Sequence, residues 1–325
     1  MKKLIFMILI IMLILTFSVS AEEIDFLLDW VPNTNHTGLF VAEEMGWFAD
    51  KDIEVNFIQP GTNMSVEQVV GAGQADLGIS FQEWLTPARI QGVPIVSLAA
   101  VIQHNTSGFA VLEEKNVETP ADLSGLEYGG WGMDIEKAII ESLVEGSGGD
   151  FAEVDFVNIG SGDLLSMLDS NKFDFTWIFY ASDGIQAEMR DIDLNIFMLE
   201  DYQEYVPDYY TPIIISSEEM IAEKPELLNS FMQVVKRGYE YAAANPEEAA
   251  EILHKKAPEN SLEFLTKSQK WLSPRYIDDA PYWGHQELEV WEEFGEWMYE
   301  QELVTEKFEA KKAFTNQFLS SEGIE

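Results

Sequence analysis

The sequence has no cysteine among its 325 residues and few basic side chains. The lack of cysteine excludes disulfides, thiolate metal sites, cysteine nucleophiles and the lipid-modified cysteine of exported lipoproteins. Only 19 lysines and arginines face 58 aspartates and glutamates, which gives a formal net charge of −39. A chain this acidic is repelled by nucleic acid and by anionic membrane surfaces, so neither is an expected partner.

Histidines are also scarce, and nothing in their spacing suggests a metal. The four, His36, His104, His254 and His285, show no metal-ligand spacing and no i,i+4 pairing with a carboxylate. The glycine-rich stretch "YGGWGMDIE" lacks the spacing of a dinucleotide fingerprint and the lysine of a phosphate loop. We therefore predict no metal and no cofactor.

Hydrophobic residues make up 46% of the chain and aromatic residues 12%, enough for substantial cores. A chain of this length exceeds what one core usually supports, so two lobes are expected. Residues 1–21 contain two lysines, a continuous apolar run and then Val19-Ser20-Ala21, which is the order of a secretory signal cleaved after Ala21. The alternative is an uncleaved membrane anchor, because the apolar run is long. Either way we expect a periplasmic or otherwise extracytoplasmic protein.

Apolar periodicity predicts alternating strands and helices. Strands are expected near residues 23–30, 52–59, 77–80 and 93–103, with amphipathic helices between them, which favours a parallel sheet covered by helices. A second unit of the same kind follows "LEYGGWG", and "YYTPIII" returns the chain to the first. The predicted fold class is α/β, with lobe 1 at 22–112 plus 211–325, lobe 2 at 113–210, and two crossings that make a hinged clamp.

The final third is predicted to be helical. Asn245 and Pro246 form a cap and a first-turn proline that split two helices. Apolar residues then recur at turn spacing and are expected in the core: Leu288, Trp291, Phe294 and Met298.

Polar side chains follow several predicted strands, at the edge where open α/β sheets bind ligands. "LLDWVPNTNHTGLF", residues 27–40, changes from apolar to polar and places there Asp29, Trp30, Asn33, Asn35 and His36. An indole can stack on a planar heterocycle while a carboxylate accepts its amino protons. The alternative is that the asparagines only form a turn and a helix cap.

Three further stretches show the same placement. "GISFQEWLTPAR" puts Gln82 and Glu83 at a helix start, where an acidic first turn is the alternative, and "AVIQHNTSGF" presents Gln103, His104, Asn105 and Thr106. A lone histidine without an evident triad favours recognition over catalysis. In the second lobe the candidates are Trp131 in the glycine-rich loop, and Tyr180 with Asp183, for which a helix cap is the alternative.

These stretches, together with "YYTPIII", resemble the substrate-binding proteins of ABC importers for thiamine pyrimidine precursors, the formylaminopyrimidine-binding, ThiY-like proteins. Hydroxymethylpyrimidine phosphate synthases are related to them. The resemblance covers nearly all of the chain after the signal. It implies a type II periplasmic-binding-protein fold, with two α/β lobes, a two-strand hinge and a ligand in the cleft between them.

The resemblance also implies roles for residues. Asp29 and Trp30 would meet a pyrimidine ring, Asn33 to His36 would line its pocket, and Tyr180 with Asp183 would close from the second lobe. Family members commonly carry Gly-Trp-Glu-Gly where this chain reads "ASDGI". The ligand can therefore differ, for example another aminopyrimidine or a flavin-like heterocycle.

Two other functions stay open. One is an exported enzyme related to the synthases, with His104 or His36 as base and Asp29 or Glu83 orienting it, although the synthases use a cysteine-rich motif that this chain lacks. The other is a clamp for sulfonates, nitrate or taurine, which favours basic residues, and the motif stretches hold only Arg89. Capture and delivery to an inner-membrane ABC permease by a monomer is the function that we expect.

Overall fold

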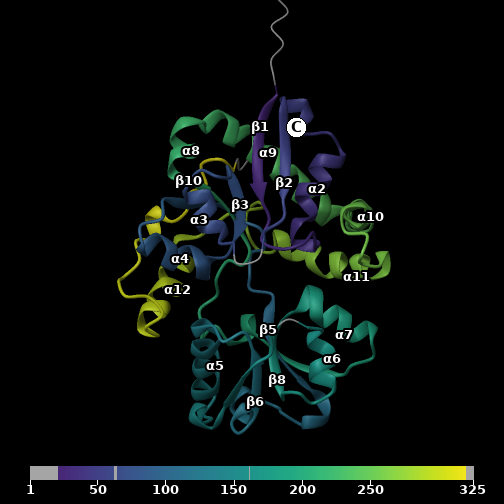
Figure 1. Ribbon diagram of the computed structural model, residues 1–325, viewed down its shortest axis with the longest axis vertical. Coiled ribbons are helices and arrows are strands. Elements are labelled where there is room, and N and C mark those ends of the chain that lie inside the picture. The colour runs from purple at the N-terminus through teal and green to yellow at the C-terminus, as the bar shows by residue number, and fades with distance from the viewer. Residues whose placement is uncertain (1–20, 62–63, 161, 320–325) are drawn as a thin grey trace, which may run out of the picture.

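The computed structural model describes residues 21–61, 64–160 and 162–319. These residues form two lobes, each built on a five-stranded sheet, which lie one above the other in Figure 1. The strand order is β2-β1-β3-β10-β4 in the first sheet and β7-β6-β8-β5-β9 in the second. The expected signal segment lies outside the described residues except for Ala21.

Five strands make up each sheet. The strands of the first sheet are β1 (Glu22–Leu27), β2 (Ile53–Ile58), β3 (Leu77–Ser80), β4 (Ile95–Ala100) and β10 (Ile213–Ser217). Those of the second are β5 (Ser107–Leu112), β6 (Glu127–Gly130), β7 (Asp155–Asn158), β8 (Phe175–Phe179) and β9 (Leu194–Met198).

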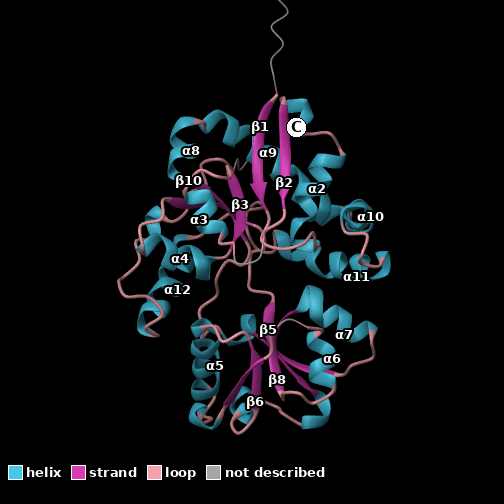
Figure 2. Ribbon diagram, in the orientation of Figure 1, coloured by secondary structure: helices cyan, strands magenta, loops and turns pink. Residues whose placement is uncertain are grey.

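Helices surround both sheets (Figure 2). Before the first crossing and after the second crossing they are α2 (Thr37–Glu44), α3 (Val66–Gly71), α4 (Gln82–Ile90), α8 (Glu218–Glu223), α9 (Pro225–Ala244), α10 (Pro246–Lys256), α11 (Leu262–Leu272) and α12 (Leu288–Glu300). Between the crossings they are α5 (Asp134–Gly146), α6 (Leu164–Asp169) and α7 (Ile185–Met189). The helical final third is confirmed, and α9 and α10 meet at Asn245 and Pro246. The Asn245 side chain donates back to the carbonyl of Tyr241, at the end of α9.

The prediction of a parallel sheet is wrong in one respect, because each sheet contains one antiparallel strand. β10 runs antiparallel to β3 and β4, and β5 runs antiparallel to β8 and β9, whereas the other recorded pairings are parallel. Both strands directly follow a crossing between the lobes, at residues 101–106 and 199–212. A chain that leaves one sheet at the carboxyl end of its parallel strands enters the other sheet at the facing edge, so it must run against them.

This reversal sets where the ligand edge of each sheet lies. Ser107, the first residue of β5, pairs with Phe179, the last residue of β8, and Ile213 of β10 pairs with Ser80 and Ala100 at the ends of β3 and β4. The carboxyl ends of the parallel strands in both sheets therefore point toward the crossings and toward each other. Binding residues at these ends can meet from both lobes.

β5 also lies in the second sheet, whereas the sequence analysis kept residues up to 112 in the first lobe. β5 lies between β8 and β9 in the second sheet, so it belongs with that lobe. We propose the crossings 101–106 and 199–212 as the limits of the lobes.

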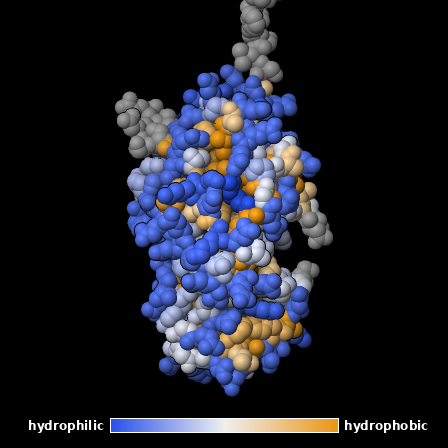
Figure 3. All heavy atoms as spheres, turned by 90° about the vertical axis from the view of Figure 1, so that its left-hand side faces the viewer, coloured by the Kyte–Doolittle hydropathy of each residue, from blue (hydrophilic) through white to orange (hydrophobic). Residues whose placement is uncertain are grey.

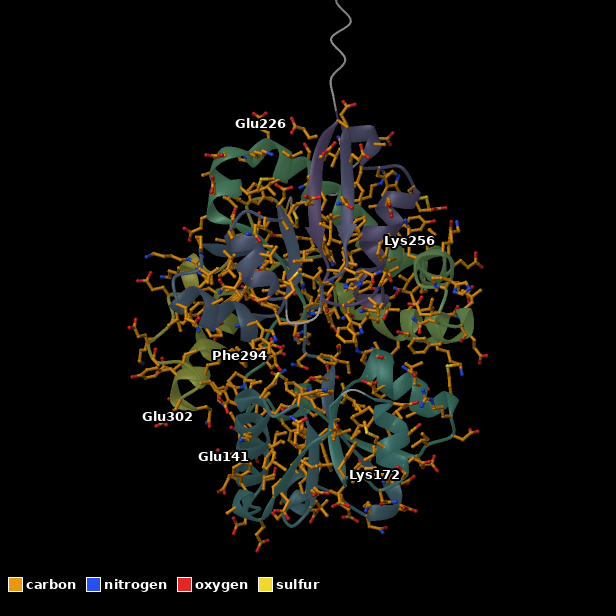
Figure 4. All side chains as sticks on the ribbon, viewed as in Figure 1. Glu141, Lys172, Glu226, Lys256, Phe294 and Glu302 are labelled. Atoms are coloured by element: carbon orange, nitrogen blue, oxygen red, sulfur yellow. The ribbon has the colours of Figure 1, made fainter. Side chains whose placement is uncertain are left out.

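Helix α12 packs into both lobes. Trp291 stacks on Phe314 in the first lobe, whereas Phe294, Trp297 and Met298 join the core of the second. Phe294 stacks on Tyr209 of the second crossing with ring centroids 4.1 Å apart, and Figure 4 labels it where the lobes meet. The expected core positions on this helix are confirmed, with Leu288 partly buried.

Of the residues that the structure describes, none forms a helix that is both long and apolar enough to cross a membrane.

Replacing Phe294 by alanine is expected to lower the free energy of unfolding by about 3–5 kcal/mol, because a fully buried ring would leave a cavity between two cores. Tyr299→Ala on the same helix is the control, since its side chain is 38% exposed and its loss should cost within about 1 kcal/mol. Urea denaturation measures both variants. Equal losses in the two would contradict the bridging role of α12.

Candidate functional site

A hollow of about 450 Å³ lies between the lobes. Its walls are α3 and α4 from the first lobe, residues 132–135 at the start of α5 from the second, and Met298 and Leu303 at the end of α12. Figure 3 views the side of the molecule that carries these helices, where apolar patches interrupt a largely hydrophilic surface. The volume is within the range of small-molecule sites.

Exposed aromatic side chains lie at or just after the strand ends that face the other lobe, and of the four described next Trp84 lines the hollow. Trp30 after β1 is 65% exposed, Trp84 after β3 39%, Trp131 after β6 44%, and Phe179 at the end of β8 40%. Aromatic side chains left exposed at the ligand edge of such sheets are candidates for contact with a planar ligand. Two of the four, Trp84 and Phe179, were not singled out from the sequence, although each lies at a strand end.

The stretch after β1 is held in place by its own polar groups. Asn33 caps the short helix Thr34–His36, and its side-chain oxygen accepts the backbone N–H of Asn35 at 2.9 Å. His36 is fully buried, and its Nδ1 accepts the backbone N–H of Asn33 at 3.3 Å. Its Nε2 therefore carries the proton and donates to Asp29 Oδ1 at 2.6 Å. Asn33 therefore forms a helix cap, which is the alternative that the sequence analysis gave for this residue.

Asp29 and Trp30 differ in exposure, because Trp30 is 65% exposed whereas the Asp29 side chain is only 11% exposed. The hydrogen bonds recorded for the described residues use Asp29 Oδ1 and leave Oδ2 without a partner. Asn35 is tied down through its carbonyl, which accepts the Tyr239 hydroxyl at 2.7 Å. Neither Asp29 nor Trp30 lines the hollow of 450 Å³ itself.

Gln82 and Glu83 begin α4 but differ in what they can do. Gln82 is fully buried and bonded at both ends, accepting from the Tyr210 backbone at 2.9 Å and donating to the Val290 carbonyl at 3.3 Å. Glu83 lies in the wall of the hollow and is 8% exposed, with no hydrogen-bond partner recorded for its Oε2. Burial, helped by the charge of Glu67, raises the pKa of Glu83 to about 8.

The first crossing is tied to the second by one carboxylate. Asp208 accepts from His104 Nδ1 at 2.6 Å and from the backbone N–H of Asn105 at 3.0 Å. The Asn105 side chain accepts from the backbone and the hydroxyl of Ser107, and Thr106 is buried beside it. This group of candidates therefore builds the hinge, although the side-chain nitrogens of Gln103 and Asn105 are buried without a recorded partner.

His104 is a charged member of that hinge. The hydrogen bond to Asp208, with a second carboxylate from Asp279 at 3.2 Å, raises the pKa of His104 to about 9. Ligand atoms of His104, Asp278 and Asp279 also lie within 4.8 Å of one another. Histidine spacing in the sequence gave no sign of this group, because its members come from distant segments. It is an ion-pair network in the structure.

Trp131 is presented by a glycine-rich loop that Glu136 holds. The buried Glu136 carboxylate accepts the backbone N–H groups of Trp131 and Met133 and the hydroxyl of Tyr128. A Cβ at Gly130 would lie 2.2 Å from the Tyr128 ring and 2.8 Å from Glu136, so only glycine fits there. The loop leaves the Trp131 indole exposed at the strand end.

Tyr180 and Asp183 lie in a single π-helical turn, Tyr180–Gly184, after β8. The Tyr180 ring stacks on Trp271 of α11 at 4.7 Å between centroids, which joins the two lobes, and its hydroxyl donates to Glu188 at 2.6 Å. Asp183 accepts the backbone N–H of Phe179 at 3.2 Å, and burial raises its pKa to about 6. Trp271, missed in the sequence, has no local signal because its partner comes from the other lobe.

The lobes, the crossings and the facing strand ends are those of the periplasmic binding proteins. The aliphatic sulphonate-binding protein SsuA of Escherichia coli has the same fold, with a TM-score of 0.72 at 12% identity over 92% of this chain and 99% of that one.

The chain belongs to the NMT1/THI5-like family, whose model matches residues 33–249. It is 29% identical to a formylaminopyrimidine-binding protein of Halalkalibacterium halodurans, over 91% of this chain and 90% of that protein. It is 22% identical to a 4-amino-5-hydroxymethyl-2-methylpyrimidine phosphate synthase of Legionella pneumophila, over 92% of each. The resemblance inferred from the sequence is therefore confirmed.

The raised pKa of His104 links stability to pH. The contribution of His104 to the free energy of unfolding is complete below pH 6.5, the ordinary pKa of histidine. It is lost as the pH rises through the raised pKa of about 9. Between pH 6.5 and 9.5 the wild-type protein should thus lose more unfolding free energy than His104→Gln does. Asp279→Asn removes only the more distant partner of His104. Its loss of unfolding free energy over this range should therefore lie between those of the wild type and His104→Gln. Urea denaturation across this range checks the sign, and parallel curves for all three proteins would refute it.

Proposed function

We propose that the protein is an exported solute-binding protein of an ABC importer. Its ligand would be a thiamine pyrimidine precursor, formylaminopyrimidine-like, or a related flat heterocycle, delivered unchanged to a permease in the inner membrane. The observation that carries this proposal is the set of exposed aromatic side chains at facing strand ends, Trp30, Trp84, Trp131 and Phe179. Aromatic faces of this kind stack on planar rings.

We propose different residues for contact with the face of the ligand ring and with its edge. Trp30 offers its indole to the ring, and Asp29 offers Oδ2 to an exocyclic amino group, while the His36 bond holds Oδ1. Trp131 approaches from the second lobe. Closure of the lobes around a ligand is favoured only as far as the ligand contacts both of them.

The state of the histidines supports binding over catalysis. Both ring nitrogens of His36 are hydrogen-bonded and its side chain is fully buried, so it has no free lone pair for a substrate. His104 has carboxylates at both nitrogens and a raised pKa, so at neutral pH it is protonated and is a poor base. The synthase relative keeps the enzyme alternative open, and recovery of the ligand followed by mass analysis separates carriage from conversion.

The charge of the hollow disfavours the anion alternatives. Among the described residues that line it, every titratable side chain is acidic: Glu67, Glu83 and Asp134. A sulfonate, nitrate or taurine sulfonate group would meet no compensating cation there. A flavin is the alternative planar ligand, and it would compete for the same aromatic faces.

Around "ASDGI" the aromatic and acidic side chains of the second lobe already have partners within the protein. The Tyr180 ring already stacks on Trp271, and the Asp183 carboxylate accepts the Phe179 amide. We therefore place the ring contacts of this lobe on Trp131 and Phe179 instead.

Trp30→Ala is expected to weaken binding of formylaminopyrimidine by about tenfold or more, because stacking of a base on an aromatic side chain contributes roughly 1–3 kcal/mol. Isothermal titration calorimetry measures the change. Leu262→Ala, an apolar side chain 39% exposed on α11, is the matched control and should bind as wild type does. If wild-type protein binds neither formylaminopyrimidine nor riboflavin, the proposed function is wrong.

A further inference from the structure

We propose that the hollow between α3, α4 and the start of α5 is a cation site, in which a protonated nitrogen of the ligand docks against Glu83 and Glu67. The inference rests on the proposed function for the heterocycle and adds the charge of that ligand. The ligand class is a flat organic cation, such as a pyrimidine with an ammonium or amidinium group.

The first step of the argument is the carboxyl group without a partner. Glu83 is more than nine-tenths buried, its Oε2 has no hydrogen-bond partner recorded, and the residue lies in the wall of the hollow. A buried polar atom without a partner is costly unless something else satisfies it. The hollow is where that partner can enter.

The second step is the neighbouring carboxylate. Glu67 on α3 accepts hydrogen bonds from Ser65 Oγ at 2.7 Å and from Ser80 Oγ. These two hydroxyl donors hold the Glu67 carboxylate in place. Its charge acts on Glu83, which lies in the same wall of the hollow.

The third step is the protonation state of Glu83. Desolvation and the charge of Glu67 raise its pKa to about 8, so at neutral pH it holds a proton. The other titratable groups around it are Tyr209 from the second crossing and Asp134 across the hollow on α5, and neither is a cation. A positively charged ligand replaces that proton, which leaves for solvent as the Glu83 carboxylate forms.

The fourth step is the shape of the rest of the wall. Trp84 lines the hollow with an indole that is 39% exposed, and Ile135 and Met298 add apolar surface from the second lobe and from α12. An aromatic face beside carboxylates binds flat cations through both stacking and charge. Asp134 adds a carboxylate from the second lobe, so a cation would draw the two lobes together.

Linkage gives the pH dependence its sign. Below about pH 8 the cation must displace the Glu83 proton, so its affinity should rise with pH by up to about tenfold per unit, and level off above 8. Binding near pH 7 should release up to one proton. A neutral ligand has neither effect.

Two pyrimidines that differ in one charge test the proposal. 4-Amino-5-aminomethyl-2-methylpyrimidine carries an ammonium group at neutral pH, and its N-formyl derivative is neutral at that position. Calorimetric titration of the wild-type protein at pH 6.5–8, in phosphate and in Tris, gives affinity and proton release together. The amine should bind about tenfold tighter or more, the worth of a charge-assisted hydrogen bond, and release a proton.

Glu83→Gln keeps the size of the side chain and removes its charge. In this variant the preference for the amine should fall by about tenfold, and proton release should disappear, since Glu67 and Asp134 remain but the group that exchanges its proton for the cation is gone. Glu226→Gln is the control, because this exposed glutamate lies at the far end of the first lobe (Figure 4) and should leave the preference unchanged.

The outcomes separate this inference from the proposed function. Equal or tighter binding of the N-formyl derivative without proton release overturns the cation site and leaves heterocycle binding standing. Binding of benzamidinium with proton release, but of neither pyrimidine, supports the cation site and overturns the pyrimidine as ligand. Binding of none of the three overturns both.

Discussion

The chain crosses between the lobes twice, and both crossings join the same facing edges of the two sheets. The rest of this structure depends on that constraint. Both crossings leave and enter at the carboxyl ends of parallel strands, which forces β5 and β10 to run antiparallel and turns the ligand edges of the two sheets toward each other. Asp208 holds the crossings together by bonding His104 and Asn105. Because of this arrangement Trp84 and Glu83 of the first lobe line the same hollow as Asp134 of the second.

Around that space the polar residues divide into supports and contacts. His36 holds Asp29, Glu136 holds the loop before Trp131, and Gln82 ties α4 to the second crossing. Buried and fully bonded groups of this kind fix the position of their neighbours. We propose the exposed indoles, and the carboxyl groups with free oxygens, as the groups that contact the ligand.

Local patterns in the sequence were enough for the elements and for the strand-end positions. Alternation and turn spacing located β1, β2 and α12, because burial of one face decides those structures. The direction of β5 and β10 could not be predicted in this way, since it depends on where the partner strands lie. Trp271 and Asp208 were not predicted for the same reason, since their partners Tyr180 and His104 are distant in sequence. Asn33 is the opposite case, because its cap is local and the sequence offered it as an alternative.

The position of β10 has a consequence for how the protein assembles. This strand fills the place between β3 and β4, yet it is made only after the whole second sheet has been synthesised. Until residues 213–217 arrive, β3 and β4 present unpaired inner edges, and the contacts that close the first sheet span more than a hundred residues. The N-terminal lobe is thus the last of the two to complete, and the nascent chain must be kept from pairing those edges with other molecules in the meantime.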